Sequence, residues 1–333
     1  MKVLGKFLFM VMFTTSVLYS QDPPRLSQED RVRLAEAFKL GESIQDRIWN
    51  WWSKAPFAVL LITEKHEFLV RHPKPSPDFD TLGYDSLLNS HVLFRKRQTA
   101  RNLLATYPGV HGVSTIVVGQ LKETGLPNST AWIVTLLHEH FHQLQQSQPD
   151  YYSATEALNL SGGDNSGMWM LNYPFPYDSG SVNRAFEGMC RTLAAALQSP
   201  ESRFQKALSS YLKARKEFQH SVSREDYRYY SLQLWQEGVA RYTEYRVAQE
   251  AAQVHSPIIE RKVLNDFIPY SSVEDSLRTT ILANLPHLSL AKLRRVVFYT
   301  VGAAEAILLD RANPEWHDRY FKNKFFLERY YEK

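Results

Sequence analysis

The chain of 333 residues has little that would suggest a disulfide-bonded or strongly charged protein. Its single cysteine, Cys190, excludes an internal disulfide and a zinc site built on thiolates, and we expect it to be a small buried apolar side chain. The balance of 39 basic and 35 acidic residues gives a net charge of only +4, which argues against a nucleic-acid partner. Low-complexity tracts and internal repeats are absent. Hydrophobic residues at 44% and charged residues at 22% indicate an ordinary globular chain.

The N-terminus has the pattern of a secretory signal. Two lysines precede an apolar run over residues 7–18, and the small residue Ser20 stands at a plausible cleavage point. The apolar run is shorter than the roughly 20 residues that a membrane-spanning helix needs. We therefore predict a signal peptide over residues 1–20, export to the periplasm or the exterior, and no stable membrane anchor after cleavage. An uncleaved anchor is the alternative.

The rest of the chain, residues 21–333, reads as one domain of class α+β. A capping box at Ser27 opens a helical pattern that continues to Trp52. Expected strands cover residues 57–63, 67–70, 91–96 and 112–119, the last with the sequence GVSTIVVG. Expected helices cover residues 131–146, 182–197, 203–220, 225–252, 289–311 and 315–331. The prediction is a small mixed, mostly antiparallel sheet in an N-terminal lobe (about 21–150), followed by a predominantly helical lobe (about 151–333).

The helix expected over residues 131–146 contains the pattern HExxH. Residues four apart on a helix lie about 40° apart around its axis, so His138 and His142 project side by side and suit one Zn²⁺. Glu139 is rotated by about 100° from His138, so its carboxylate can reach a zinc-bound water without binding the metal. His140 points away from this face, and we interpret it as structural.

A strand such as GVSTIVVG, followed by a helix with HExxH, resembles the core of the zincin metallopeptidases. The residues QLQQSQ after His142 lack the histidine that the metzincin branch would place there. The segment 235–245, WQEGVARYTEY, is similar to the later helix of the gluzincin branch, which supplies a glutamate as third ligand. The resemblance implies a zincin-like fold, one Zn²⁺ per chain, and His138, His142 and Glu237 as its ligands.

The residues around Glu237 favour the same interpretation on their own. Gly238 costs about 1 kcal/mol in a helix relative to alanine, and a small side chain there lets another helix approach closely. Glu244 lies seven residues further on the same face, where it can hydrogen-bond a ligand histidine. Glu156 and Asp164 are the alternative third ligands.

These features lead to two hypotheses of different class. The first is an exported zinc-dependent hydrolase, a metallopeptidase acting on a peptide or protein, with Glu139 as general base. The second is an exported binding or scaffold protein that keeps a structural zinc. Glu139 favours the first, because a structural site has no use for a free carboxylate beside the metal. We also expect strand 112–119 to hold extended substrate through free backbone groups, and we consider Tyr299 as a donor to the developing oxyanion.

Overall fold

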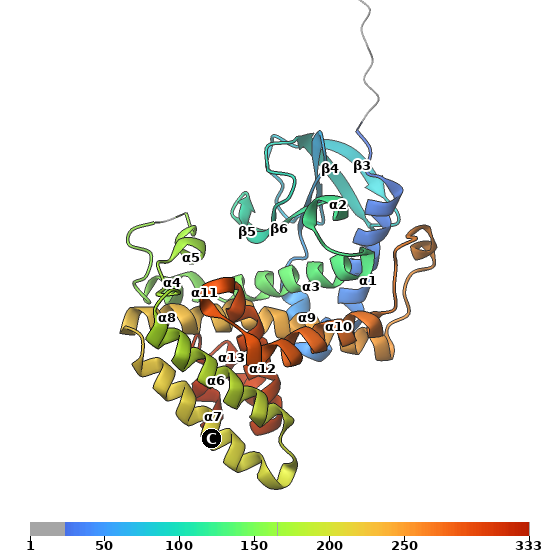
Figure 1. Ribbon diagram of the computed structural model, residues 1–333. Coiled ribbons are helices and arrows are strands. Elements are labelled where there is room, and N and C mark those ends of the chain that lie inside the picture. The colour runs from blue at the N-terminus through green and yellow to red at the C-terminus, as the bar shows by residue number, and fades with distance from the viewer. Residues whose placement is uncertain (1–23, 165, 333) are drawn as a thin grey trace, which may run out of the picture.

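The computed structural model describes residues 24–164 and 166–332. The predicted signal peptide lies outside these residues. Figure 1 shows a sheet at one end of the molecule and a larger group of helices at the other, with α3 between them. Within the described residues, no helix has both the length and the apolar character needed to cross a membrane. The arrangement confirms the α+β class.

Six strands form one mixed sheet in the order β3-β4-β2-β1-β6-β5. Strand β1 pairs in parallel with β6, and every other neighbouring pair is antiparallel, as the sequence predicted. Two of the strands, β3 and β5, were not predicted, and both lie at the edges of the sheet. The strands are β1 (Val59–Ile62), β2 (His66–Val70), β3 (Asp80–Asp85), β4 (Ser90–Lys96), β5 (Leu104–Val110) and β6 (Val113–Gly119).

The pairing of β6 corrects one prediction. Strand β6 is the observed form of the segment 112–119, for which we expected free backbone groups. It is hydrogen-bonded to β1 on one side and to β5 on the other, so it has no free edge. Its run of buried β-branched residues suits a strand inside the sheet rather than at its edge. The edge beside α3 belongs to β5 instead.

The helical elements follow the predicted pattern in part. The helix expected to reach Trp52 ends at Ile48, the helix expected over residues 315–331 is an α-helix only over Trp316–Tyr320, and the helix Tyr270–Asn284 was not predicted. Two further predicted helices are interrupted. The predicted helix 225–252 is continuous from α8 to α9 but contains a π-helical turn at Leu234–Gly238, here called the π turn. The predicted helix 289–311 is divided at Arg294, where φ is 51°. The helices are α1 (Gln28–Ile48), α2 (Leu121–Thr124), α3 (Ser129–Gln146), α4 (Tyr151–Glu156), α5 (Trp169–Asn172), α6 (Gly180–Gln198), α7 (Glu201–His220), α8 (Arg224–Gln233), α9 (Val239–Val254), α10 (Tyr270–Asn284), α11 (Leu290–Leu293), α12 (Val296–Ala312) and α13 (Trp316–Tyr320).

Local signals account for the helices that position the site. The side chain of Ser27 accepts a hydrogen bond from the backbone N–H of Asp30 and so caps α1 as predicted. Asn128 caps α3 in the same way through Ala131. Helix α3 is buried along most of its length because the sheet strands β5 and β6 cover one side and α1 and α9 cover others. The larger of two apolar clusters extends from Leu26 to Tyr330 through both groups of elements, and the smaller one lies in the sheet around Leu60, Ile62 and Leu69.

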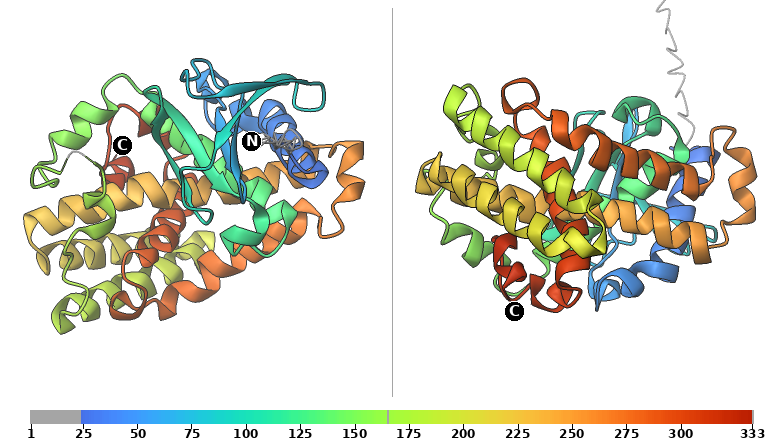
Figure 2. Two further views of the ribbon diagram at one scale, coloured as in Figure 1. Left: turned by 90° about the horizontal axis from the view of Figure 1, so that it is seen from above. Right: turned by 60° about the horizontal axis from the view of Figure 1, so that its bottom comes forward.

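The helical body is built around α9 and α12, with α6 and α7 side by side at its outer margin (Figure 2). The closest contact lies between the π turn and α12, where Gly238 faces Gly302. A Cβ atom built on Gly302 would lie 2.6 Å from Cα of Gly238 and 2.7 Å from the carbonyl oxygen of Leu234. Glycine is therefore required at both positions for the two backbones to meet. This contact confirms the expectation that Gly238 permits close approach of another helix.

We predict that Gly302→Ala destabilises the protein by about 1–3 kcal/mol, because the added methyl group must push two backbones apart. The intrinsic helix propensity of alanine favours the substitution by about 1 kcal/mol, so the loss is a net effect of packing. Gly188 is the matched control. It also lies inside a helix, α6, but a Cβ atom there meets nothing within 4 Å. Gly188→Ala should be neutral or stabilising in the same urea-unfolding measurement, and equal losses for both variants would contradict the packing argument.

Candidate metal centre

Three polar side chains of α3 form a buried group that could hold a metal ion. His138 and His142 lie one turn apart with their ring centroids 4.9 Å from each other. Together with Glu139 they offer ligand atoms that all lie within 4.8 Å of one another. The exposed fraction is 4% for His138 and 6% for each of the other two, so water satisfies little of their polarity. Buried groups of this kind need charged or hydrogen-bonded partners.

Glu237 reaches this group from the π turn. Its Oε2 atom lies 3.4 Å from Nε2 of His142 and 4.0 Å from Nε2 of His138. Neighbouring ligand atoms of a tetrahedral zinc site lie about 3.3 Å apart, given Zn–N and Zn–O distances near 2.0–2.1 Å. Two imidazole nitrogens and one carboxylate oxygen at these separations could therefore hold a divalent metal ion. Single π turns in otherwise regular helices often occur at functional sites.

A second carboxylate, that of Glu244, faces the outer nitrogen of His138. Oε2 of Glu244 lies 3.3 Å from Nδ1 of His138, so that ring directs Nε2 toward Glu237. Within the described structure both atoms are buried and have no well-formed hydrogen bond. Arg241 approaches the same Oε2 atom at 2.7 Å and balances its charge. Carboxylates that hold the outer nitrogen of a ligand histidine are the usual support of zinc sites.

Gln145 joins the two elements that carry the candidate ligands. Its Oε1 atom lies 2.6 Å from Nδ1 of His142, and its Nε2 atom donates to the carbonyl oxygens of Trp235 and Gln236 at 3.3 and 3.2 Å. Tyr320 reinforces this link, because its hydroxyl accepts from Gln145 at 2.7 Å and donates to Trp235 at 2.6 Å. One amide therefore sets both the ring of His142 and the backbone of the π turn.

Charge attraction dominates the electrostatics of the ligand group. Burial alone would lower the pKa of His142, but the adjacent carboxylate of Glu237, together with Glu139 and Gln145, outweighs burial and raises that pKa to about 9. Burial likewise opposes ionisation of Glu237, but the charges of His142, Arg295 and His138 hold its pKa well below the usual range. A position that attracts a proton this strongly also attracts a metal cation, and binding of the metal releases the proton.

Glu139 points toward the sheet. The hydroxyl of Thr106, on the edge strand β5, donates to Oε2 of Glu139 at 2.7 Å and lies 3.0 Å from its backbone oxygen. This contact holds the carboxylate of Glu139 beside the two histidines. Glu139 is therefore not one of the three candidate ligands, which are His138, His142 and Glu237.

Tyr299 and Arg295 approach from α12 and its N-cap. The ring of Tyr299 lies nearly parallel to that of His138, with 6.3 Å between their centroids. Burial and the negative charge of Glu237 raise the pKa of Tyr299, so its hydroxyl keeps its proton. Nη1 of Arg295 lies 3.5 Å from Oε1 of Glu237. The suggestion from the sequence that Tyr299 lies near the metal position agrees with this arrangement.

His140 has the structural role that its position on the helix predicts. Its ring stacks on Phe57 at 3.9 Å, and its two nitrogens lie 2.8 Å from Gln143 and 3.0 Å from Gln45. Burial lowers its pKa to about 3, so the ring is neutral. It faces the core on the side of α3 away from Glu237.

The two alternative third ligands lie elsewhere. Glu156 is exposed at the end of α4. The carboxylate of Asp164 accepts hydrogen bonds from the backbone of Ser166 and Trp169, so it stabilises the loop before α5. Neither residue joins the group on α3.

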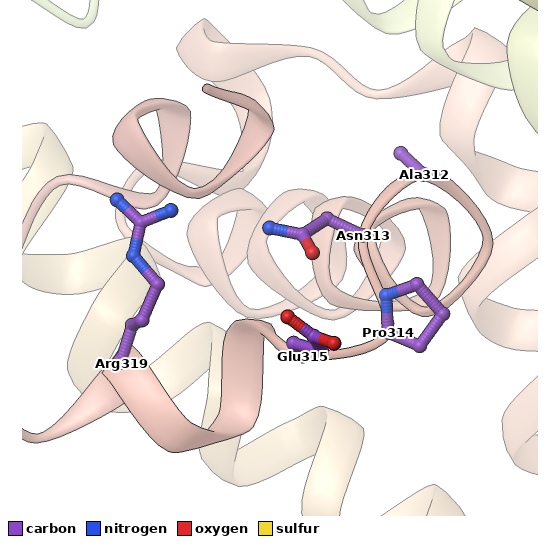
Figure 3. Close-up of a pocket in the computed structure, with 5 residues that line it drawn as sticks. All are labelled: Ala312, Asn313, Pro314, Glu315 and Arg319. Atoms are coloured by element: carbon purple, nitrogen blue, oxygen red, sulfur yellow. The ribbon is translucent and has the colours of Figure 1, made fainter. Parts of the chain in front are cut away.

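A hollow at the other end of α12 is unrelated to this group (Figure 3). It is lined by Ala312, Asn313, Pro314, Glu315 and Arg319. Asn313 and Arg319 donate to backbone carbonyls of the C-terminal segment at 2.7 Å each, so the polar groups of this hollow serve the fold.

Several residues of the site, among them Tyr320 and Arg241, were not singled out from the sequence. Gln145 could have been, because it follows His142 by three positions and so shares its side of the helix. Thr106 lies in a strand that contains Pro108 and was not predicted. Arg295 has no local pattern that points to the site.

Comparisons of the chain with models of protein families, with curated proteins and with solved structures found no match. Its function is therefore inferred from the geometry above.

We predict that the purified protein binds about one divalent ion per chain and that His138→Ala abolishes this binding, because two nitrogen ligands on one helix face act together. His140→Ala should retain the ion, since that ring faces the core. Elemental analysis of the folded variants provides the measurement. Equal loss of metal from both variants would overturn the assignment of the two faces of α3.

We further predict that Glu237→Gln weakens metal binding about 10-fold or more, because a neutral amide is a poor ligand for zinc. Glu156→Gln removes the same charge from an exposed position and should leave the affinity unchanged. Competition with a chromogenic chelator measures both. An unaltered affinity in Glu237→Gln would remove this residue from the ligand set.

Proposed function

We propose that this chain is an exported zinc-dependent hydrolase, a metallopeptidase of the gluzincin type. The observation that carries the proposal is the position of Glu139. It adds a carboxylate to a group in which His138, His142 and Glu237 already supply three ligand atoms. A zinc site with three protein ligands leaves one coordination position for water or substrate, as catalytic sites do.

The ligand set favours zinc among the divalent ions. Two imidazoles and one carboxylate, with no thiolate, match the ligands of catalytic zinc. When bound, zinc lowers the pKa of a coordinated water to about 7 and polarises a carbonyl group. The residues of the chain supply the remaining functions.

Glu139 acts as the general base in this proposal. Its carboxylate accepts a proton from the attacking water as the oxygen–carbon bond forms at the substrate carbonyl. The same proton then passes to the leaving nitrogen as the carbon–nitrogen bond breaks, so the products are a carboxylic acid and an amine. The hydroxyl of Thr106 holds the carboxylate in place at 2.7 Å.

Tyr299 supplies a hydrogen-bond donor for the oxyanion that develops on the carbonyl oxygen. Its raised pKa keeps the hydroxyl protonated at neutral pH. Preorganised donors of this kind typically account for about 10²–10³-fold in rate.

The edge strand β5 supports a peptide as the substrate. It pairs with β6 on one side, and its residue Thr106 contacts Glu139. An extended peptide adds to such a sheet edge through backbone hydrogen bonds, which brings its own carbonyl groups past the base. The N-terminal pattern over residues 1–20 supports export.

We predict that Glu139→Gln keeps zinc and folds normally but loses about 10²–10⁴-fold in rate, because the amide preserves the size of the side chain and removes the base. The hydroxyl of Thr106 can still donate to the amide oxygen, so the local structure should persist. Digestion of an unbiased peptide library by the mature chain, followed by mass spectrometry, identifies a substrate. Zinc content and turnover are then measured on the same preparation.

Glu156→Gln is the control, because it removes an exposed carboxylate and should turn over at the wild-type rate. Wild-type turnover by Glu139→Gln would assign the hydrolysis to another source. A zinc-loaded wild type that cleaves nothing in the library would favour the scaffold hypothesis.

A further inference from the structure

Two arginines flank Tyr299 beside the metal centre. The guanidinium carbon of Arg295 lies 5.3 Å from the centre of the Tyr299 ring, and that of Arg241 lies 5.9 Å from it. The side chains come from different parts of the chain, the N-cap of α12 and the first turn of α9. Their exposed fractions are 22% for Arg295 and 34% for Arg241, so both are partly accessible to a ligand.

The backbone before Arg295 has an unusual conformation. Arg294 has φ 51° and ψ −136°, a region that residues other than glycine rarely occupy. This residue ends α11, and the chain then enters α12, where Arg295 and Tyr299 lie one turn apart on the same face. The turn at Arg294 thus determines where the guanidinium of Arg295 meets Glu237.

Within residues 24–164 and 166–332, Arg295 pairs with Gln233 and Glu237 through a single nitrogen, and the ring of Tyr299 lies beside its guanidinium. Its hydrogen bond to Oε1 of Gln233, at 3.1 Å, and its ion pair with Glu237 both use Nη1. Nε and Nη2 carry three further N–H donors in the plane of the guanidinium. A fork of this geometry matches the two oxygens of a carboxylate.

The charges of the centre favour an anion once the metal is bound. The carboxylates of Glu139, Glu237 and Glu244 face the histidines, and Arg241 and Arg295 contact two of these carboxylates. Three negative and two positive side chains leave one net negative charge, so a divalent ion gives the centre one net positive charge. Without the two arginines, the same loaded centre would repel an anion.

We propose that Arg295, supported by Arg241, binds a carboxylate of the substrate beside the metal, so that the preferred substrates are peptides with a carboxylate close to the cleaved bond. This inference rests on the proposed function, because it names the substrates of the same site. Arg295 contacts substrate in this role and determines specificity. The carboxylate belongs either to the C-terminus of the peptide or to an aspartate or glutamate side chain next to the cleaved bond.

Matched peptide pairs distinguish these two sources. One pair shares a cleaved sequence and ends in either a free carboxylate or an amide. The other pair is amidated and carries glutamate or glutamine next to the cleaved bond. We expect the wild type to prefer the carboxylate member of one pair by about 10-fold or more in kcat/KM, as for a hydrogen-bonded ion pair. The pair that shows the preference identifies the source.

Variants at Arg295 test the assignment. Arg295→Gln should reduce the preference about 10-fold or more, and Arg295→Lys should restore part of it through charge alone. Arg191→Gln is the control, because it removes the same charge from α6, where Arg191 pairs with Glu187. A preference that survives in Arg295→Gln would overturn the assignment, as would equal kcat/KM for both members of both pairs in the wild type.

A binding measurement separates this inference from the proposed function. Calorimetry uses zinc-loaded Glu139→Gln protein with an acetylated tripeptide acid, its amide, and the corresponding glutamate and glutamine amides. Tighter binding of one carboxylate form, lost when Arg295→Gln is added, supports the subsite even if no peptide is cleaved. Equal binding within both pairs rejects the subsite, whereas hydrolysis without preference would leave the proposed function standing.

Discussion

The contact between Gly238 and Gly302 is the constraint on which the arrangement of the metal centre depends. The backbones of the π turn and α12 meet there, closer than any side chain would permit. Because of this approach, Glu237 lies beside both histidines and Tyr299 lies beside His138, although the two residues come from different helices. The π turn contributes at the same point, since it re-aims Glu237 while the helix on either side continues. Ligand geometry therefore follows from backbone packing as much as from the ligand residues.

The polar side chains of the centre form a connected series in which the carboxylates of Glu244 and Glu237 each lie between an arginine and a histidine. Arg241 contacts Glu244, which contacts the outer nitrogen of His138. Arg295 contacts Glu237, which faces the inner nitrogens of both histidines. An isolated ionised group would be expensive to bury, and alternation of charge removes most of that expense. His140, the neighbour of Glu139 in the sequence, avoids this expense in a different way. Burial lowers the pKa of its ring, so the ring is buried without charge.

The sequence predicted those parts of the structure that depend on local patterns. The period of the apolar residues and the capping residues determined α1, α3, α6 and α7, and the HExxH spacing predicted that His138 and His142 share one face. Both missed strands are at sheet edges, where half-exposed backbone allows polar residues, glycine and proline. Strand β5 contains Pro108 and Gly109, and these two residues indicate a loop when only the local sequence is considered. Its identity as the edge beside α3 comes from pairing with β6, and pairing is not visible in a local pattern.

The hydrogen bonds of Gln145 have a consequence for the order in which the centre forms. Gln145 and the π turn are about 90 positions apart, and Tyr320, which supports both, is separated from Gln145 by 175 positions. During synthesis from the N-terminus, the two histidines are therefore present long before their carboxylate partner and the hydroxyl that supports it. Two imidazoles on one helix are a weak ligand set, so binding of an ion at this candidate site would require the C-terminal helices to dock first. The candidate metal centre thus depends on Tyr320, a residue that offers it no ligand atom but holds the amide beside His142.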